Sequence, residues 1–283
     1  MKSTLAAVCF TISSFASFSQ SFRGSIRDLV TKEALPYASI GIRQKGIGTI
    51  TDLDGRFKFD VSQASNQDTL VISYIGYSSL LLPISKLDVK QENTFELKPT
   101  PKLLKEVVIS AKPETIILGN KSKSSRYTGW GDFKSSRGRA IGLLIKSPAF
   151  PVRVNKLFFH VDCEFDSARV RINLFKMNGK KLEPFASQKQ NIFFTIHKRR
   201  GWIEVGLNET IVLRHEEVIV AIEWVDAWAK PRAIEQGGSY LFTLSLAHSL
   251  GYHYIRKTPE ESIRLTSSEF TPSIYLECFA IRD

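Results

Sequence analysis

The stretch Gly48–Tyr77 constrains the fold most, because its side chains alternate between apolar and polar at the spacing of a β-strand. Phe57, Phe59 and Val61 alternate with charged neighbours, which predicts a strand with one buried face. The Asp-Leu-Asp-Gly sequence that ends at Gly55 predicts a tight turn, since aspartate side chains bond to nearby backbone amides and glycine tolerates positive φ. The pattern predicts stacked sheets rather than a helical domain.

Similar alternation recurs throughout residues 20–110, with turn residues at regular intervals. Roughly seven short strands fit into this length, which is the pattern of an all-β sandwich. No long amphipathic helix is indicated. We therefore expect residues 20–110 to form a first domain with an all-β fold.

Three segments of this first domain, taken together, resemble the carboxypeptidase-regulatory-like domain. They are Gly24-x-Ile26 with Leu35-Pro36-Tyr37-Ala38, then Gly48–Phe57, then Leu70–Tyr77. The resemblance implies a transthyretin-like β-sandwich, found at the periplasmic N-terminus of starch-utilisation-type TonB-dependent outer-membrane receptors. Leu104–Ile109 resembles the segment that follows the domain in those receptors. The receptor function is not implied, because the rest of the chain does not resemble those receptors.

The first 19 residues have the pattern of a secretory signal peptide. Lys2 precedes the apolar stretch Leu5–Phe18, and the small residues around Phe18 fit a cleavage site near Ser19–Gln20. No later stretch is long and apolar enough to be a transmembrane helix. The sequence therefore predicts a secreted protein of the Gram-negative envelope, in the periplasm or associated with the outer membrane or cell surface.

The chain is basic, with a formal net charge of +11, and part of that charge lies in the segment Lys112–Arg139. Proline, glycine and serine are frequent in this segment, so we expect residues 111–139 to be a solvated linker. Its positive charge would also suit contact with an anionic surface. We expect no nucleic acid partner, because an exported protein rarely meets nucleic acid. An envelope protein or a glycan is the expected partner.

Residues 140–283 repeat the strand pattern over a second region, which we expect to be a β-sandwich of the jelly-roll type. Trp224 continues the apolar face of a strand and is expected in the core. Trp228 is expected in a loop, where an exposed ring would suit contact with a ligand such as a sugar. This half resembles no family that we name.

Two cysteines, Cys163 and Cys278, follow the predicted signal peptide, and each lies on the apolar face of a predicted strand. Two interpretations stay open. In an oxidising compartment the two residues can pair as a disulfide, or they can remain buried free thiols, a common state for cysteine.

The sequence has no motif for a known catalytic site: no Gly-x-Ser-x-Gly elbow, no His-Glu-x-x-His and no phosphate-binding glycine loop. We therefore predict no catalytic, metal-binding or cofactor-binding residues. The leading hypothesis is a non-catalytic binding or assembly protein of the bacterial cell envelope. Two alternatives remain: a carbohydrate-binding accessory protein that uses loop aromatics of the C-terminal sandwich, and a hydrolase whose carboxylates no motif marks.

Overall fold

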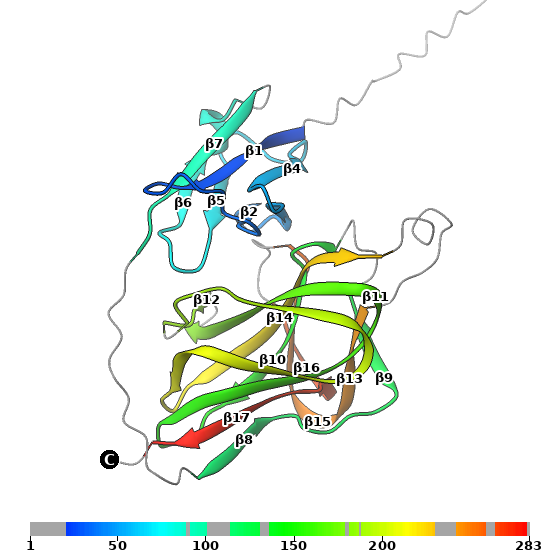
Figure 1. Ribbon diagram of the computed structural model, residues 1–283. Helices are drawn as coiled ribbons and strands as arrows, with labels where there is room; N and C mark the ends of the chain where they lie inside the picture. Colours follow the sequence, from blue (N-terminus) through cyan, green and yellow to red (C-terminus); the bar gives the residue numbers. More distant parts are fainter. Residues whose placement is uncertain are drawn as a thin grey trace, which may run out of the picture.

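The computed structural model describes residues 21–88, 91–100, 114–130, 136–178, 181–186, 188–229, 242–258 and 264–281. Figure 1 shows that they fold into two groups of strands, one above the other. We call residues 21–100 the N-terminal module and residues 114–281 the C-terminal module. The expected all-β fold class is confirmed, because β-strands dominate both modules.

Within the described residues, no helix is long and apolar enough to cross a membrane.

The N-terminal module consists of two sheets that enclose a core. One sheet has the order β4 (Arg56–Asp60), β1 (Ser21–Asp28), β7 (Glu92–Leu97), and the other has the order β3 (Ile47–Ile50), β2 (Ser39–Ile42), β5 (Thr69–Ser73), β6 (Leu80–Pro83). A 3-10 turn, η1 (Ile84–Lys86), follows β6. β1 pairs antiparallel with β4 and parallel with β7. This arrangement confirms the β-sandwich that the sequence predicts for this part of the chain.

Aromatic rings fill the space between these two sheets. Phe22 of β1 lies 5.4 Å from Phe57 and 5.9 Å from Phe59, measured between ring centroids. Phe57 and Phe59 are buried while the charged residues between and beside them are exposed, as the alternation predicts. At Gly24, a Cβ atom would lie 2.1 Å from the carbonyl oxygen of Asn93, so only glycine lets β1 approach β7 this closely.

The C-terminal module is one ten-stranded sheet that curls back on itself. Its main path runs β16-β15-β10-β14-β11-β17-β8, and β15 also pairs with β11. The strands are β8 (Thr115–Gly119), β9 (Arg126–Gly129), β10 (Ala140–Lys146), β11 (Val152–Asn178), β12 (Lys181–Pro184), β13 (Ile192–Leu213), β14 (Glu217–Trp228), β15 (Phe242–Arg256), β16 (Arg264–Pro272) and β17 (Ile274–Ala280). The curled sheet encloses the larger core. The jelly-roll type stays a prediction.

The predicted linker, residues 111–139, is wrong where the structure describes it. β8 pairs with β17 and β9 pairs with β15, so both strands belong to the C-terminal sheet. Trp130 is fully buried, and its ring stacks on Phe242 at a centroid distance of 4.5 Å. The physical reason is that β8 and β9 pair with only one neighbouring strand each, and such edge strands tolerate the polar and glycine-rich composition that also marks linkers.

Basic residues of the same segment contact the protein itself. The guanidinium of Arg126 lies 4.0 Å from the centroid of the Phe270 ring, and the ammonium of Lys121 lies 5.6 Å from that of Tyr275. Part of Lys112–Arg139 falls outside the described residues. Contact of this segment with an anionic surface therefore stays a prediction.

Candidate functional site

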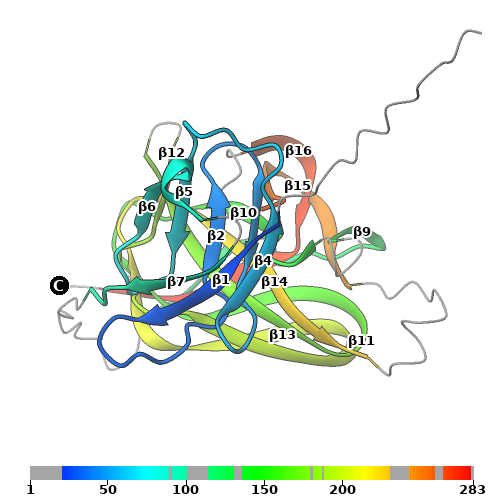
Figure 2. The ribbon, with the colours of Figure 1, turned by 90° about the horizontal axis from the view of Figure 1, so that it is seen from above.

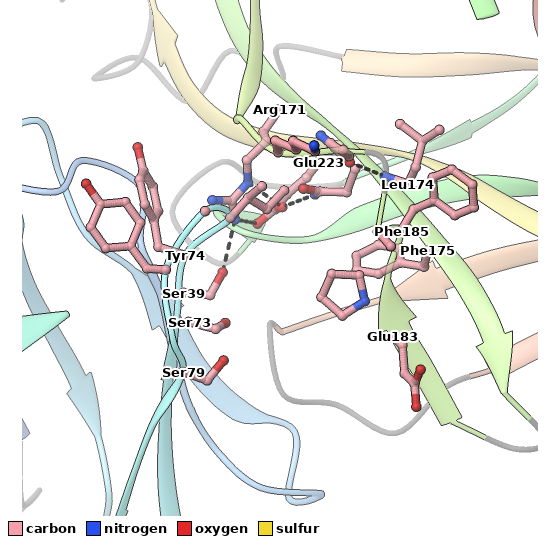
Figure 3. Close-up of a pocket in the computed structure, with 18 of the residues that line it drawn as sticks. Ser39, Ser73, Tyr74, Ser79, Arg171, Leu174, Phe175, Glu183, Phe185 and Glu223 are labelled. Atoms are coloured by element: carbon pink, nitrogen blue, oxygen red, sulfur yellow. Dashed lines mark hydrogen bonds and ion pairs between the residues drawn. The ribbon is translucent and has the colours of Figure 1, made fainter. Parts of the chain in front are cut away.

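The two modules meet along a cavity of about 480 Å³. The N-terminal module contributes the end of β5 and the turn that follows it, and the C-terminal module contributes parts of β11, β12 and β14. Figure 3 shows Ser39, Ser73 and Ser79 on one side of this cavity and Phe175 and Phe185 on the other. Figure 2, the view from above, shows the N-terminal module lying over the C-terminal module. The cavity lies between them, because residues of both modules line it.

A buried ion pair lies at the inner end of this cavity. Arg171 of β11 donates two hydrogen bonds to Glu223 of β14, with N–O distances of 3.0 Å and 2.8 Å. The Glu223 side chain is fully buried and that of Arg171 nearly so. Asn173 and Arg256 also reach the Glu223 carboxylate, at 2.6 Å and 3.2 Å. Such a pair is tolerated in the interior because its charges compensate each other and its polar atoms are satisfied.

The same arginine joins the two modules. Its remaining N–H groups donate to the carbonyl oxygen of Tyr37 at 2.6 Å, to the hydroxyl of Ser39 at 3.0 Å and to Asn191 at 3.5 Å. Tyr37 and Ser39 belong to the N-terminal module, whereas Glu223 belongs to the C-terminal module. A buried arginine that bonds to both modules holds them in one relative orientation. We call Arg171, Asn173, Glu223 and Arg256 the joint.

Tyr37 makes a second contact across the same interface. Its hydroxyl donates to the Asp226 carboxylate at 3.1 Å, and its ring lies 5.3 Å from that of Phe193. Burial and the nearby Asp226 charge raise the pKa of Tyr37 to about 12, so the phenol stays protonated. Thr51 fixes the backbone on both sides of Tyr37. Its hydroxyl donates to the carbonyl oxygen of Leu35 and accepts from the amide of residue 38.

The close approach of the modules also depends on Gly76, in the turn after β5. Its φ is +89°, and a Cβ atom there would lie 2.9 Å from the carbonyl oxygen of Lys189 in the C-terminal module. Any other residue would have to adopt a strained backbone and would push the two modules apart. Gly76, which lies in the Leu70–Tyr77 segment of the family resemblance, is therefore part of the interface.

The cavity wall formed by the N-terminal module carries hydroxyl groups. Ser73, Tyr74, Ser79 and Thr100 line it, and no hydrogen bond from their hydroxyls to another described residue is present. Burial raises the pKa of Tyr74, although the positive charges of Arg171 and Arg169 oppose that shift. The phenol therefore stays neutral and can donate or accept a hydrogen bond.

The structure places Trp228 at the end of β14, paired with Ser167, so the expected loop position is wrong. Its side chain is 41% exposed, as the sequence analysis expects for a surface aromatic residue. It does not line the cavity between the modules. Trp224, the other tryptophan of this strand, is in the core as predicted. The role of Trp228 in ligand contact stays a prediction.

The disulfide between Cys163 and Cys278 is not present, because both cysteines are buried free thiols. Cys278 of β17 pairs with Val154 of β11. Val154 lies nine residues before Cys163 on the same strand, which corresponds to roughly 30 Å of extended backbone. A disulfide needs its Cα atoms within about 7 Å. The alternative of two buried free thiols is the one that the fold allows.

We expect both thiols to resist alkylation in the folded protein. Burial raises the pKa of Cys163 to about 11 and that of Cys278 to about 12. The reactive thiolate is therefore scarce at about pH 8, and the folded chain also shields both sulfur atoms. Mass spectrometry after iodoacetamide treatment should show neither Cys163 nor Cys278 labelled in the folded protein and both labelled in the denatured protein. Rapid labelling of either cysteine before unfolding would contradict the buried positions.

Sequence reasoning missed the joint. Arg171 and Asn173 alternate with core residues on β11, a pattern in which the polar side chains usually face solvent. Glu223 was the available signal, because it interrupts the apolar run of β14 and a lone acid in such a run needs a buried partner. No cluster of three or more metal-ligating side chains occurs within the described ranges.

Comparison with known proteins identifies the N-terminal part of the chain. The family described as CarboxypepD_reg-like domain matches residues 22–109. The TonB-dependent receptor SusC of Bacteroides thetaiotaomicron is 32% identical over 105 residues, which are 37% of this chain and 10% of the receptor. The chain thus spans a small part of that relative's length.

Among solved structures, the cysteine protease and lectin-like domains of Cwp84, a surface layer associated protein of Clostridium difficile, match with a TM-score of 0.33 and 11% identity. That match covers 50% of this chain and 32% of the Cwp84 chain, and it is too weak to support any argument. The family match, in contrast, agrees with the two-sheet sandwich of the N-terminal module. Residues 22–109 are therefore a carboxypeptidase-regulatory-like domain.

Proposed function

We propose that this protein is an exported, non-catalytic binding protein of the bacterial cell envelope, and that the cavity between its modules is the ligand site. The joint carries this proposal. Arg171 bonds to both modules from a buried position, so the cavity has a fixed shape in the absence of ligand. A largely preformed cavity with a few polar groups is typical of a small-molecule site.

The envelope location is supported by two observations. The N-terminal residues have the pattern of a signal peptide. The carboxypeptidase-regulatory-like domain and the partial similarity to an outer-membrane receptor also favour export. Because the similarity covers 10% of the receptor, only the location is carried over and not the receptor's activity.

Binding is favoured over catalysis by the state of the charged groups. The Glu223 carboxylate accepts hydrogen bonds from Arg171 and Asn173 and forms an ion pair with Arg256, so it is poorly placed to take a proton from a ligand. A general base needs a free lone pair within reach of the substrate. The hydrolase alternative therefore lacks support at this cavity.

The proposal is tested by expressing the full chain with a C-terminal tag in a Gram-negative host. We expect the protein in the envelope or periplasmic fraction, with a mature N-terminus near Gln20 by mass spectrometry. An uncleaved chain in the cytosol would overturn the proposed location. Release of new reducing ends from polysaccharides by the purified protein would overturn the non-catalytic assignment and favour the hydrolase.

A second candidate function is carbohydrate binding through Trp228. The observation that favours it is the exposure of this ring, which lies outside the cavity. Exposed aromatic rings stack on the apolar faces of sugars, but single exposed rings are also common on protein surfaces. Glycan binding that is lost in Trp228→Ala would identify this surface as the ligand site.

A further inference from the structure

We propose that the cavity between the modules binds an uncharged saccharide, one to three sugar units long. This inference rests on the proposed binding function and adds the chemical class of the ligand. Three features of the cavity support it: one wall of hydroxyls, one wall of aromatic rings, and charged groups that are already paired.

The hydroxyl wall supplies hydrogen bonds that the protein does not use itself. Ser73 ends β5 and Tyr74 follows it directly, and Ser79 and Thr100 also line the cavity. These hydroxyls lack hydrogen bonds to the other described residues. Each can both donate and accept, and a ligand with many hydroxyl groups needs partners of this kind.

The opposite wall contains apolar rings beside Glu183. Phe175, Pro184 and Phe185 line it, and Figure 3 shows both phenylalanine rings on the side away from the serines. Phe185 is nearly fully buried, which fixes its ring. A pyranose ring has an apolar face of C–H groups and a rim of hydroxyls. Its face suits the phenylalanine wall while its rim reaches the serine wall.

The charges of the joint argue against an ionic ligand at that part of the cavity, which Glu183 and Lys189 also line. All five N–H groups of Arg171 are used within the protein, by Glu223, Tyr37, Ser39 and Asn191. Arg256 shares the Glu223 carboxylate. An anionic ligand would have to break these buried contacts, and removing one partner of such a pair is costly. A neutral ligand leaves the joint intact.

The volume fits a short saccharide. About 480 Å³ lies within the range of about 300–1,000 Å³ that is usual for small-ligand sites. A long polysaccharide would have to extend beyond the cavity between the modules. We therefore expect affinity to stop increasing once the ligand has two or three units.

The test is isothermal titration calorimetry on the purified protein with four probes: a neutral disaccharide series, a hexuronic acid, a dipeptide and a short fatty acid. We expect saturable binding of at least one neutral disaccharide at millimolar concentration or below, and no binding of the other three probes. Binding of the dipeptide or fatty acid alone would overturn the saccharide assignment, while leaving the proposed binding function standing. Failure of all four probes would overturn the inference.

Variants of the serine wall then locate the site. Ser73→Val removes one hydroxyl, and the loss of one neutral hydrogen bond should weaken binding by about 2- to 10-fold. Ser79→Trp places a large ring at an exposed position of the rim and should abolish binding. Thermal unfolding checks that both variants remain folded. The matched control is Trp228→Ala, which should bind normally; loss of binding in this control, with normal binding in Ser79→Trp, would place the site at Trp228 and overturn the inference.

Discussion

Glu223→Ala should lower the free energy of unfolding by about 3–5 kcal/mol, the cost of leaving a buried charge without its partner. The variant leaves Arg171 buried with no carboxylate, removes the acceptor of Asn173 and removes the ion-pair partner of Arg256. The expected loss is a large fraction of the stability of a typical protein. Urea unfolding followed by circular dichroism measures it.

The matched control is Glu217→Ala, which removes the same residue type from the same strand. Glu217 pairs with Lys146 at 2.8 Å, but both side chains are largely exposed to solvent. Exposed ion pairs contribute about 0–1 kcal/mol, so this variant should unfold almost as the wild type does. Equal effects of the two substitutions would show that the joint does not stabilise the folded protein.

Trp130→Ala should lower the free energy of unfolding by about 3–5 kcal/mol, the usual range for truncating a fully buried aromatic side chain. The ring stacks on Phe242 and approaches Trp224, and its indole N–H donates to the carbonyl oxygen of Arg139 at 2.9 Å. The substitution therefore removes packing on two rings and leaves a cavity in the larger core. Urea unfolding, monitored by circular dichroism, measures the loss.

Trp228→Ala is the control for this prediction, since it removes the same side chain from a partly exposed position. Surface substitutions away from special features usually change stability by less than about 0.5 kcal/mol. A small effect of Trp130→Ala, similar to that of the control, would mean that Trp130 belongs to a solvated linker, as the composition of residues 111–139 suggests. A large effect would confirm that the C-terminal core begins well before residue 140.

The strands of the N-terminal module were predictable because each one carries its own signal. In β4 the alternation of Phe57 and Phe59 with exposed charges reports a single buried face. The glycine at position 55 has φ of +72°, as a turn requires. These signals are local, so they depend on no other part of the chain.

The joint was not predictable in the same way, because its burial depends on a contact distant in sequence. Arg171 lies on the polar side of β11, where it bonds to Ser39 of the N-terminal module, 132 residues away in the sequence. β11 is a single long strand with bulges in its pairing with β13. An alternating pattern records which residues share a face, but not what covers that face.

The pairing of β1 with β7 has a mechanical consequence. The two strands run parallel along six consecutive residue pairs, from Arg23 with Glu92 to Asp28 with Leu97. The start of β1 and the end of β7 therefore leave the module at opposite ends. A pull on the chain along this axis would load the whole ladder of hydrogen bonds in shear, whereas an antiparallel hairpin pulled at its open end would unzip one bond at a time.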